Sequence, residues 1–281
     1  MMTRIIILAG YFVMMSYLFV TNKLNQYINP RYQYLIIMTL VLALILTLVE
    51  LFKWAKEDSV ENDGLHEHEN CGHNHGGTSP LGKAMSTVLL ILPIIVVLFF
   101  PSVSLDASVV TSKGFNFPVS KDSTSFGDIE QQYLKPNTHI FFNDEDYEAM
   151  MKKDFEELGD LTEVVLNEDN YLQVMELIYN YPQAFAGKPI KLNGFMYNEP
   201  KTGKQFLFRF GVLHCVADSG VYGLLLDSES DLVYPDNQWL SIEGVIDSQY
   251  YEPFGQTLPT VKVEKTTKIS PPKNEYVYRL F

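Results

Sequence analysis

Three long apolar runs in the first part of the chain constrain its fold more than any other feature. They cover residues 5–20, 34–52 and 85–100, and Glu50 is the one charged residue within them. A membrane-spanning helix needs about 20 mainly apolar residues, with a range of roughly 17–25. The runs therefore predict three transmembrane helices, at about 5–22, 34–52 and 85–101, in a membrane region that covers residues 1–102.

The first run also has one property of a signal peptide, because Arg4 precedes the apolar residues. However, no small-x-small cleavage site follows Val20, and two further apolar runs come after it. These two observations favour a helix that is retained in the mature protein.

The basic residues near the ends of the runs predict the orientation, since Lys and Arg accumulate on the cytoplasmic side. One side of the expected membrane would carry four of them and the other side only Lys23 and Arg31; the four are Arg4, Lys53, Lys56 and Lys83. We therefore expect a multi-pass protein of the cell membrane. Its N-terminus and the loop 56–82 would be cytoplasmic, and its C-terminal domain extracytoplasmic.

The part of the chain beyond residue 102 is acidic. It holds 27 of the 34 acidic side chains and 15 of the 21 basic ones. Nucleic-acid binding and docking onto anionic lipid head groups both require clustered positive charge. The composition therefore argues against both and is typical of a soluble surface.

The loop 56–82 contains a cluster of potential metal ligands. Imidazole and thiolate groups bind zinc, copper and nickel, and five such groups occur close together: His66, His68, Cys71, His73 and His75. Gly72, Gly76 and Gly77 indicate a flexible loop, which favours weak or buffering binding. The alternative is a polar linker without a ligand. If there is a cofactor, we expect a transition metal ion, with zinc first.

Residues 103–182 are expected to form an extended segment followed by helices. Residues 144–159 and 170–181 each place their apolar side chains on one helical face, and the second helix ends before Pro182. Residues 183–281 change to short alternating strands. We expect strands at 189–196, 205–215, 222–226, 238–246 and 260–269.

Five short antiparallel strands preceded by a helix suggest a C-terminal soluble α+β domain with a small OB-like β-barrel. Gly194 and Gly244 would suit the kinks that such a barrel needs. A small β-sandwich is the alternative. The expected fold class is thus a membrane protein with three N-terminal transmembrane helices and this domain.

Several segments resemble the YcgQ-type family of proposed permease subunits from Gram-positive bacteria. They are the Tyr27–Arg31 stretch, the His-rich loop, Gly187–Phe195, Phe206–Asp218, Trp239 with Glu243-Gly244, and Pro271–Tyr276. The resemblance implies a membrane protein that acts beside a separate multi-span permease. The family pattern carries two consecutive cysteines before Ala-Asp, whereas here His214 replaces the first one. That replacement argues against a vicinal dithiol and is compatible with metal ligation.

His214, Cys215 and Asp218 are the candidate metal or thiol site of the soluble domain. Adjacent strand residues point to opposite faces, so one ion could bind His214 and Cys215 only where the strand bends or ends. Cys71 would lie across the membrane, which leaves Cys215 unpaired as a ligand, a reactive thiol or a small buried side chain.

Arg209 is the remaining candidate residue. It lies on the opposite strand face from Phe206, Phe208 and Phe210. This position is compatible with an exposed charge or a structural ion pair, and the functional alternative is a contact with a partner or an anion.

The chain lacks the motifs of hydrolases, Gly-rich phosphate loops and Cys-x-x-Cys, so we do not expect an enzyme. The first functional hypothesis is a non-catalytic subunit of a two-component permease. Its soluble domain would gate a multi-span partner or bind substrate for it. The alternative is a metal sensor or metallochaperone that uses the His-rich loop and the His214-Cys215 pair.

Overall fold

The computed structural model describes residues 2–60, 80–100, 104–113, 115, 143–229 and 232–279. The chain divides into two compact units. The first, here called the helical unit, contains residues 1–24 and 32–103. The second, here called the sheet domain, contains residues 104–281 together with the short segment Asn25–Arg31.

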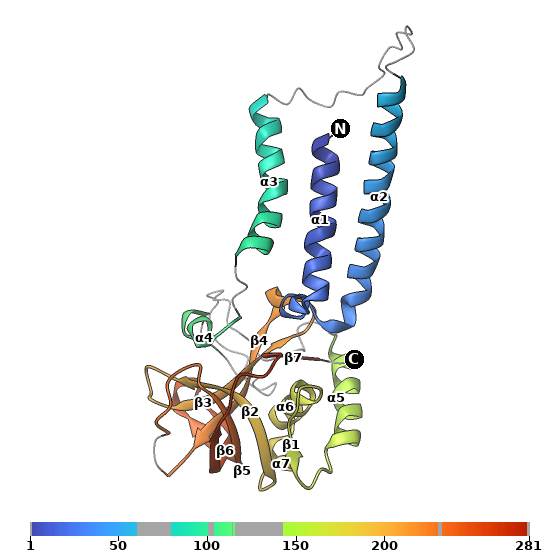
Figure 1. Ribbon diagram of the computed structural model, residues 1–281. Coiled ribbons are helices and arrows are strands. Elements are labelled where there is room, and N and C mark those ends of the chain that lie inside the picture. Colours follow the sequence, from blue (N-terminus) through green and yellow to red (C-terminus); the bar gives the residue numbers. More distant parts are fainter. Residues whose placement is uncertain are drawn as a thin grey trace. The chain divides into compact units, whose positions relative to one another are not determined.

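The helical unit consists of α1 (Met2–Val20), α2 (Gln33–Val60) and α3 (Pro80–Phe99). In Figure 1 α1 lies between the other two helices and contacts both. The Tyr11 hydroxyl donates a hydrogen bond to the Leu90 carbonyl (3.0 Å). Gly10 leaves room for Ile94, whose Cδ1 atom would lie 3.0 Å from a Cβ atom at position 10. Large apolar side chains cover the outside of the helices.

Two of the described helices are long and apolar enough to cross a membrane, namely Met2–Val20 and Pro30–Lys56. The apolar part of α3, Ala84–Phe99, is shorter, and Pro93 lies within it. Three spans were expected, and two of the three helices meet the length criterion.

The sheet domain contains all five expected strands. They are β2 (Pro189–Asn198), β3 (Gln205–Val212), β4 (Gly220–Asp227), β5 (Trp239–Tyr251) and β6 (Gln256–Lys268). Their order is β2-β5-β6-β4-β3, and an additional β2–β3 pairing closes the series into a ring. Four pairings in this ring are antiparallel, and β4–β6 is parallel. Two short strands extend the sheet: β1 (Val164–Val165) beside β2 and β7 (Tyr276–Tyr278) beside β3.

Both faces of the ring are buried, each in its own apolar cluster. The first cluster holds aliphatic residues such as Leu207 and Leu224, together with the buried face of α6 (Tyr171–Asn180). The second cluster is rich in aromatic side chains and includes Phe206 and Phe208. Alternate residues of β3 thus enter alternate clusters, as the period-2 geometry of a strand requires.

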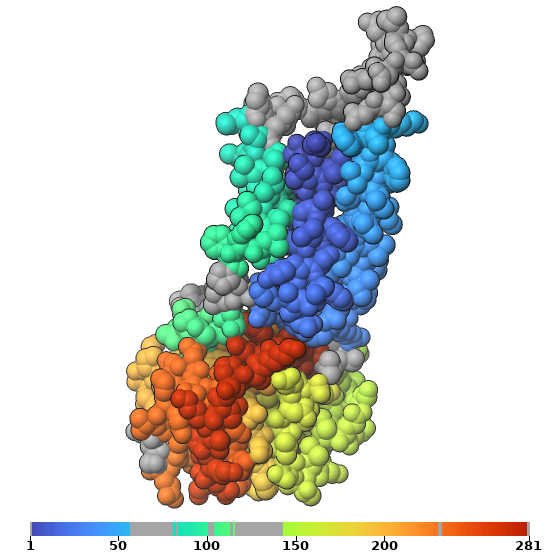
Figure 2. All heavy atoms as spheres, in the orientation of Figure 1, coloured from blue at the N-terminus to red at the C-terminus, as the bar shows by residue number. Residues whose placement is uncertain are grey.

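Short helices cover the ring. In Figure 1, α5 (Asp144–Leu158), α6 and α7 (Pro182–Phe185) lie on one side of the strands. α4 (Ala107–Lys113) lies on the surface of the domain (Figure 2). Four 3-10 turns complete the described elements: η1 (Lys23–Gln26), η2 (Pro30–Tyr32), η4 (Val216–Asp218) and η5 (Glu252–Phe254).

Gly244 and Gly194 lie where strands approach too closely for a side chain. A Cβ atom at position 244 would lie 2.2 Å from the Lys262 carbonyl oxygen, and the β5–β6 register shifts at this point. A Cβ atom at position 194 would lie 2.7 Å from the Phe208 carbonyl oxygen. The absence of a side chain therefore permits the tight curvature that closes the ring.

Candidate functional site

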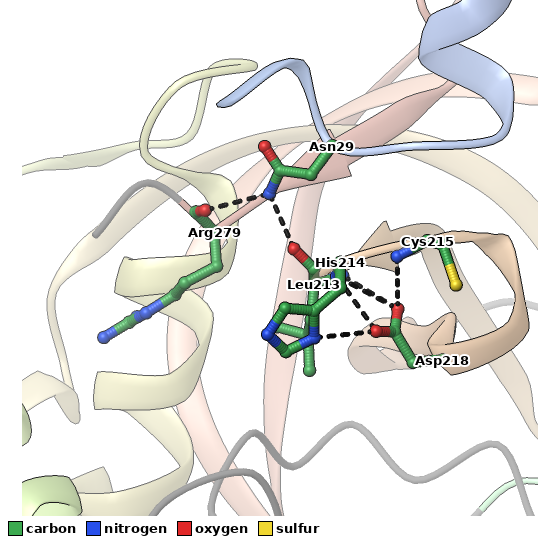
Figure 3. Close-up of polar contacts among 6 residues, drawn as sticks. All are labelled: Asn29, Leu213, His214, Cys215, Asp218 and Arg279. Carbon is green, nitrogen blue, oxygen red and sulfur yellow. Dashed lines mark hydrogen bonds and ion pairs between the residues drawn. The ribbon is translucent and has the colours of Figure 1, made fainter. Parts of the chain in front are cut away.

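The candidate site begins at the turn after β3, which the Asp218 carboxylate organises (Figure 3). This carboxylate accepts hydrogen bonds from the backbone amides of His214 (2.9 Å), Cys215 (3.2 Å) and Leu213 (3.3 Å). A short acidic side chain can satisfy several amides in this way because it reaches back to the preceding turn. Asp218 thereby fixes the backbone at the end of the strand.

The imidazole of His214 also contacts this carboxylate. Its Nδ1 atom lies 2.9 Å from Asp218 Oδ2, and 45% of the His214 side chain is exposed. A carboxylate on one ring nitrogen fixes the orientation of the ring. The sulfur of Cys215 points away from the imidazole in Figure 3, as expected for adjacent residues of an extended segment.

The loop between α1 and α2 is paired with this turn. Ile28 forms an antiparallel bridge with Cys215. The bridge has one hydrogen bond on each side, from Asn29 N to the His214 carbonyl (2.9 Å) and from Val216 N to the Tyr27 carbonyl (2.8 Å). The segment Asn25–Arg31 therefore belongs to the sheet domain although two apolar helices flank it in the sequence.

Asn29 is fully buried, and its side chain is fully used (Figure 3). The amide nitrogen donates to the carbonyls of Leu213 (2.8 Å) and Arg279 (3.1 Å). Its side-chain oxygen accepts from the Arg31 amide (3.0 Å). Buried polar groups stabilise a fold only when they are paired, and all the polar groups of this side chain are paired. We call Asn29 with its partners Leu213 and Arg279 the joint. The joint connects the loop, the end of β3 and the C-terminal segment.

Arg279 extends the joint into the helices of the domain. Its guanidinium forms ion pairs with Asp154 on α5 and with Glu176 on α6, the latter at 2.7 Å. The side chains of Arg279 and Glu176 are each 1% exposed, and that of Asp154 is 7% exposed. Two carboxylates thus compensate one buried cation, which holds the C-terminal segment against α5 and α6.

Arg209 is buried rather than exposed, which excludes the interpretation as an exposed strand charge. Its guanidinium lies 5.6 Å from the Tyr171 ring centroid and 5.5 Å from that of Trp239. It also donates a hydrogen bond to the Asn274 carbonyl (2.8 Å). Burial lowers the pKa of Arg209, and nearby Tyr171 and Glu168 oppose the shift. The face of β3 that carries Arg209, opposite the phenylalanines, is buried because α6 covers it.

The candidate metal ligands are only partly brought together. His214 and Asp218 are in contact, but the described residues contain no group of three or more His, Cys, Asp or Glu side chains that could hold a metal ion. In the turn, Asp218 is already occupied by backbone amides. The five ligands of the His-rich loop lie in residues 61–79, outside the described residues, so zinc binding there stays a prediction.

Sequence reasoning missed four residues of the joint and its extension: Asn29, Asp154, Glu176 and Arg279. Asn29 lies in the Tyr27–Arg31 stretch, which supported the family resemblance without indicating a role. Arg279 follows Tyr276-Val277-Tyr278, and three alternating residues are too few to predict a strand. No signal in the sequence connects either residue with a partner.

The chain is similar to known proteins over its whole length. The family model of the DUF1980 N-terminal domain matches residues 3–116, and that of the DUF1980 C-terminal domain matches residues 141–279. A Streptococcus mutans protein named as a proposed two-component membrane permease complex subunit is 37% identical over 285 residues. The UPF0703 protein YcgQ of Bacillus subtilis is 36% identical over 289 residues. Both matches cover 100% of each chain. No solved structure matches the chain.

Proposed function

We propose that this chain, which belongs to the DUF1980 family, is a non-catalytic membrane subunit of a two-component permease complex. The name of the Streptococcus mutans relative supports this role. The apolar helices, which account for the membrane location, support it as well. In this proposal the sheet domain gates a separate multi-span partner or binds substrate for it.

One observation supports a specific membrane topology: the segment Asn25–Arg31 belongs to the sheet domain. The chain leaves this domain at Tyr32 and returns to it at Ser104. An excursion that starts and ends on one side of a membrane must cross it an even number of times. We infer that α2 and α3 both cross and that α1 carries the N-terminus to the opposite side.

The length of α3 is compatible with this inference. The apolar part of the helix, Ala84–Phe99, corresponds to about 24 Å at 1.5 Å per residue, somewhat less than the ~30 Å of a hydrocarbon core. Local thinning of the bilayer accommodates a mismatch of this size. The basic residues Arg4, Lys53, Lys56 and Lys83 then share one side, the cytoplasmic one. In this proposal the sheet domain lies outside the cytoplasm.

We further assign the strand ring to the OB type. Five strands in the order β2-β5-β6-β4-β3, closed by β2–β3 and with one parallel pairing, support a small Greek-key barrel over a sandwich. α6 packs against the first apolar cluster and closes it. OB barrels serve as binding modules, which is compatible with a substrate-capturing or gating role.

The joint at Asn29 supplies a physical route for gating. The loop that it holds is continuous with α1 and α2, so a movement of the sheet domain pulls on both helices through Asn25–Arg31. A partner that grips the helices would thereby be coupled to events in the domain. The coupling needs no catalysis by this chain.

Co-purification tests the proposed function. The full chain, carrying a C-terminal affinity tag, is isolated from its own membranes in mild detergent, and the co-purifying proteins are identified. We expect one multi-span membrane protein in a fixed ratio to the tagged chain. An Asn29→Asp variant, which disrupts the joint, should retain less of the co-purifying partner. The exposed Lys262→Ala variant should retain as much of it as wild type. Recovery of the chain alone from membranes would contradict the role as a subunit.

A further inference from the structure

The chain passes between its two units at three points: before Asn25, after Arg31 and before Ser104. Two segments of the sheet domain therefore adjoin the helical unit. The first connection is Asn25–Arg31, between α1 and α2, and the second connection is residues 104–113, which follow α3. Both connections form hydrogen bonds with β7, the last strand of the chain.

Two tyrosines of β7 make these bonds. The Tyr278 hydroxyl donates to the Asn25 carbonyl (2.5 Å), and the Tyr276 hydroxyl accepts from the Leu105 amide (2.8 Å). Residues two apart in a strand lie on one face, about 6–7 Å from each other. Both tyrosine rings belong to the second apolar cluster, whereas Val277 between them belongs to the first. The two connections thus bind at neighbouring positions on one face of β7.

The residues on either side of β7 add further contacts. The Arg279 carbonyl accepts a hydrogen bond from the Asn29 side chain of the first connection (Figure 3), and the buried Arg279 guanidinium pairs with α5 and α6. Before the strand, the Asn274 carbonyl accepts from Arg209 on β3 (2.8 Å). We call residues 274–279 the C-terminal anchor. It is bound to the domain at both ends and contacts both connections.

The backbone pairing of β7 is short. Three register pairs join it to β3 in parallel. β7 is also the last strand in the sheet order, so no other described strand pairs with it. A parallel ladder is slightly less stable per residue than an antiparallel one. Side-chain contacts therefore supply a large share of what holds the anchor, and the loss of one of them loosens the anchor as a unit.

Each connection also has contacts that do not involve the anchor. In the second connection, Val110 is fully buried and the Thr111 side chain forms a hydrogen bond with Tyr197. In the first connection, the Asn29 backbone amide donates to the His214 carbonyl (2.9 Å). A loosened anchor should therefore weaken both connections without detaching either of them.

We propose that the C-terminal anchor couples the two connections, so that loosening one of them loosens the other. A change in either connection acts on the anchor through one tyrosine and reaches the other connection through the second tyrosine. Such coupling is reciprocal by thermodynamic necessity. One segment then sets how firmly all three junctions with the helical unit are held. Because these contacts lie within the sheet domain, the coupling depends neither on the permease role nor on the number of spans.

Hydrogen exchange of the full chain in detergent, measured peptide by peptide, provides the first test. Tyr276→Phe removes the acceptor of the Leu105 amide and keeps the ring. We expect about fivefold faster exchange in residues 104–113, the effect of one lost hydrogen bond, and at least about twofold faster exchange in Asn25–Arg31. Tyr250→Phe is the matched control, because 64% of Tyr250 is exposed, and it should change neither connection.

Exchange in β2 and β5 separates coupling from general destabilisation, since β7 pairs with neither strand. It should stay as in wild type. Acceleration confined to residues 104–113 would overturn the proposal, because the connections would then respond independently. An equal acceleration of β2 and β5, or no acceleration in either connection, would overturn it as well.

The reciprocal variant and the double variant provide the second test. Tyr278→Phe removes the donor to the Asn25 carbonyl and should also accelerate exchange in both connections. When one opening event breaks both bonds, their free-energy costs add and their fold effects multiply. The double variant should therefore show the product of the two single effects in each connection. If each connection responds only to the tyrosine that it contacts, the anchor does not couple them.

Discussion

The side-chain amide of Asn29 donates a hydrogen bond to the backbone carbonyl of Arg279, a residue 250 positions later in the chain. The same amide reaches the Leu213 carbonyl at the end of β3. One short side chain thus joins the loop between α1 and α2 to the sheet domain. This relationship fixes the segment Asn25–Arg31 within the sheet domain.

Asn29→Asp is expected to destabilise the sheet domain. The substitution keeps the shape of the side chain but turns an amide donor into a carboxylate that faces two carbonyl oxygens. Leaving buried acceptors unpaired costs about 1–3 kcal/mol each, and the buried charge adds to this cost. Thermal unfolding in detergent should show a loss of at least about 2 kcal/mol. An unchanged midpoint, equal to that of the exposed Lys262→Ala control, would show that the joint contributes nothing.

Arg279→Met should be more damaging, because it leaves the buried carboxylates of Asp154 and Glu176 without a cation. Removing one partner of a buried ion pair costs about 3–5 kcal/mol. The matched control is the triple variant Arg279→Met, Asp154→Asn, Glu176→Gln, in which these three positions carry no charge. Denaturant unfolding should show partial recovery in the triple variant. If the single and triple variants are equally unstable, shape rather than charge is what Arg279 provides.

Alkaline pH should unfold the sheet domain through its buried tyrosines. Burial, with a smaller contribution from Glu176, raises the pKa of Tyr147 to about 12, and burial raises the pKa of Tyr278 to about 12. Their ordinary pKa is about 10. The unfolded chain therefore loses these protons first, so the stabilisation is complete below pH ~10 and is lost as the pH rises towards ~12. Each tyrosine contributes roughly 3 kcal/mol to this loss.

Circular dichroism and tyrosinate absorbance, recorded together, check this dependence. Tyr147→Phe should make the decline above pH ~10 shallower. Tyr250→Phe is the control, because 64% of Tyr250 is exposed. A decline of the same steepness in both variants would contradict the assignment to Tyr147.

Zinc binding should separate the two candidate metal sites. Replacing His66, His68, His73 and His75 together by Ala is expected to lower the zinc stoichiometry of the full chain, since these imidazoles would be the main ligands of the predicted loop site. His214→Ala should leave the stoichiometry unchanged, because Asp218 is engaged by backbone amides. Calorimetric titration measures both. Unchanged binding in the four-histidine variant would remove the loop from any metal-related role.

The local pattern of the chain predicted its elements well. Apolar periodicity indicated α5 and α6, and alternation indicated β2 to β6, because these signals arise from neighbouring residues. Gly244 could even be placed at a kink, where the β5–β6 register does shift. The short strand β7 and the helix α4 were missed, since three and seven residues carry too little periodicity.

Long-range relationships could not be predicted in the same way. Arg209 alternates with phenylalanines and was expected to be exposed or ion-paired, but α6 covers the other face as well and places Tyr171 against its guanidinium. Asn29 lies in a polar connection, and its partners are 184 and 250 residues away. Burial of such residues depends on tertiary packing, which no local pattern encodes.

A disulfide between position 28 and Cys215 tests whether the α1–α2 loop is bound in the sheet domain. Ile28 and Cys215 are directly opposite each other, with their hydrogen bonds made by the flanking residues. Such pairs have Cα atoms about 4.5 Å apart, within the range of a disulfide. Ile28→Cys is prepared in a Cys71→Ala background, purified and mildly oxidised, and Asn25→Cys in the same background is the control.

We expect a rapid intramolecular disulfide in Ile28→Cys, seen as faster migration in non-reducing gels and as the loss of two free thiols by mass spectrometry. The product should disappear when Cys215 is replaced by Ser. Two thiols that stay free, or equal bridging from position 25, would contradict the seating of the loop in the sheet domain.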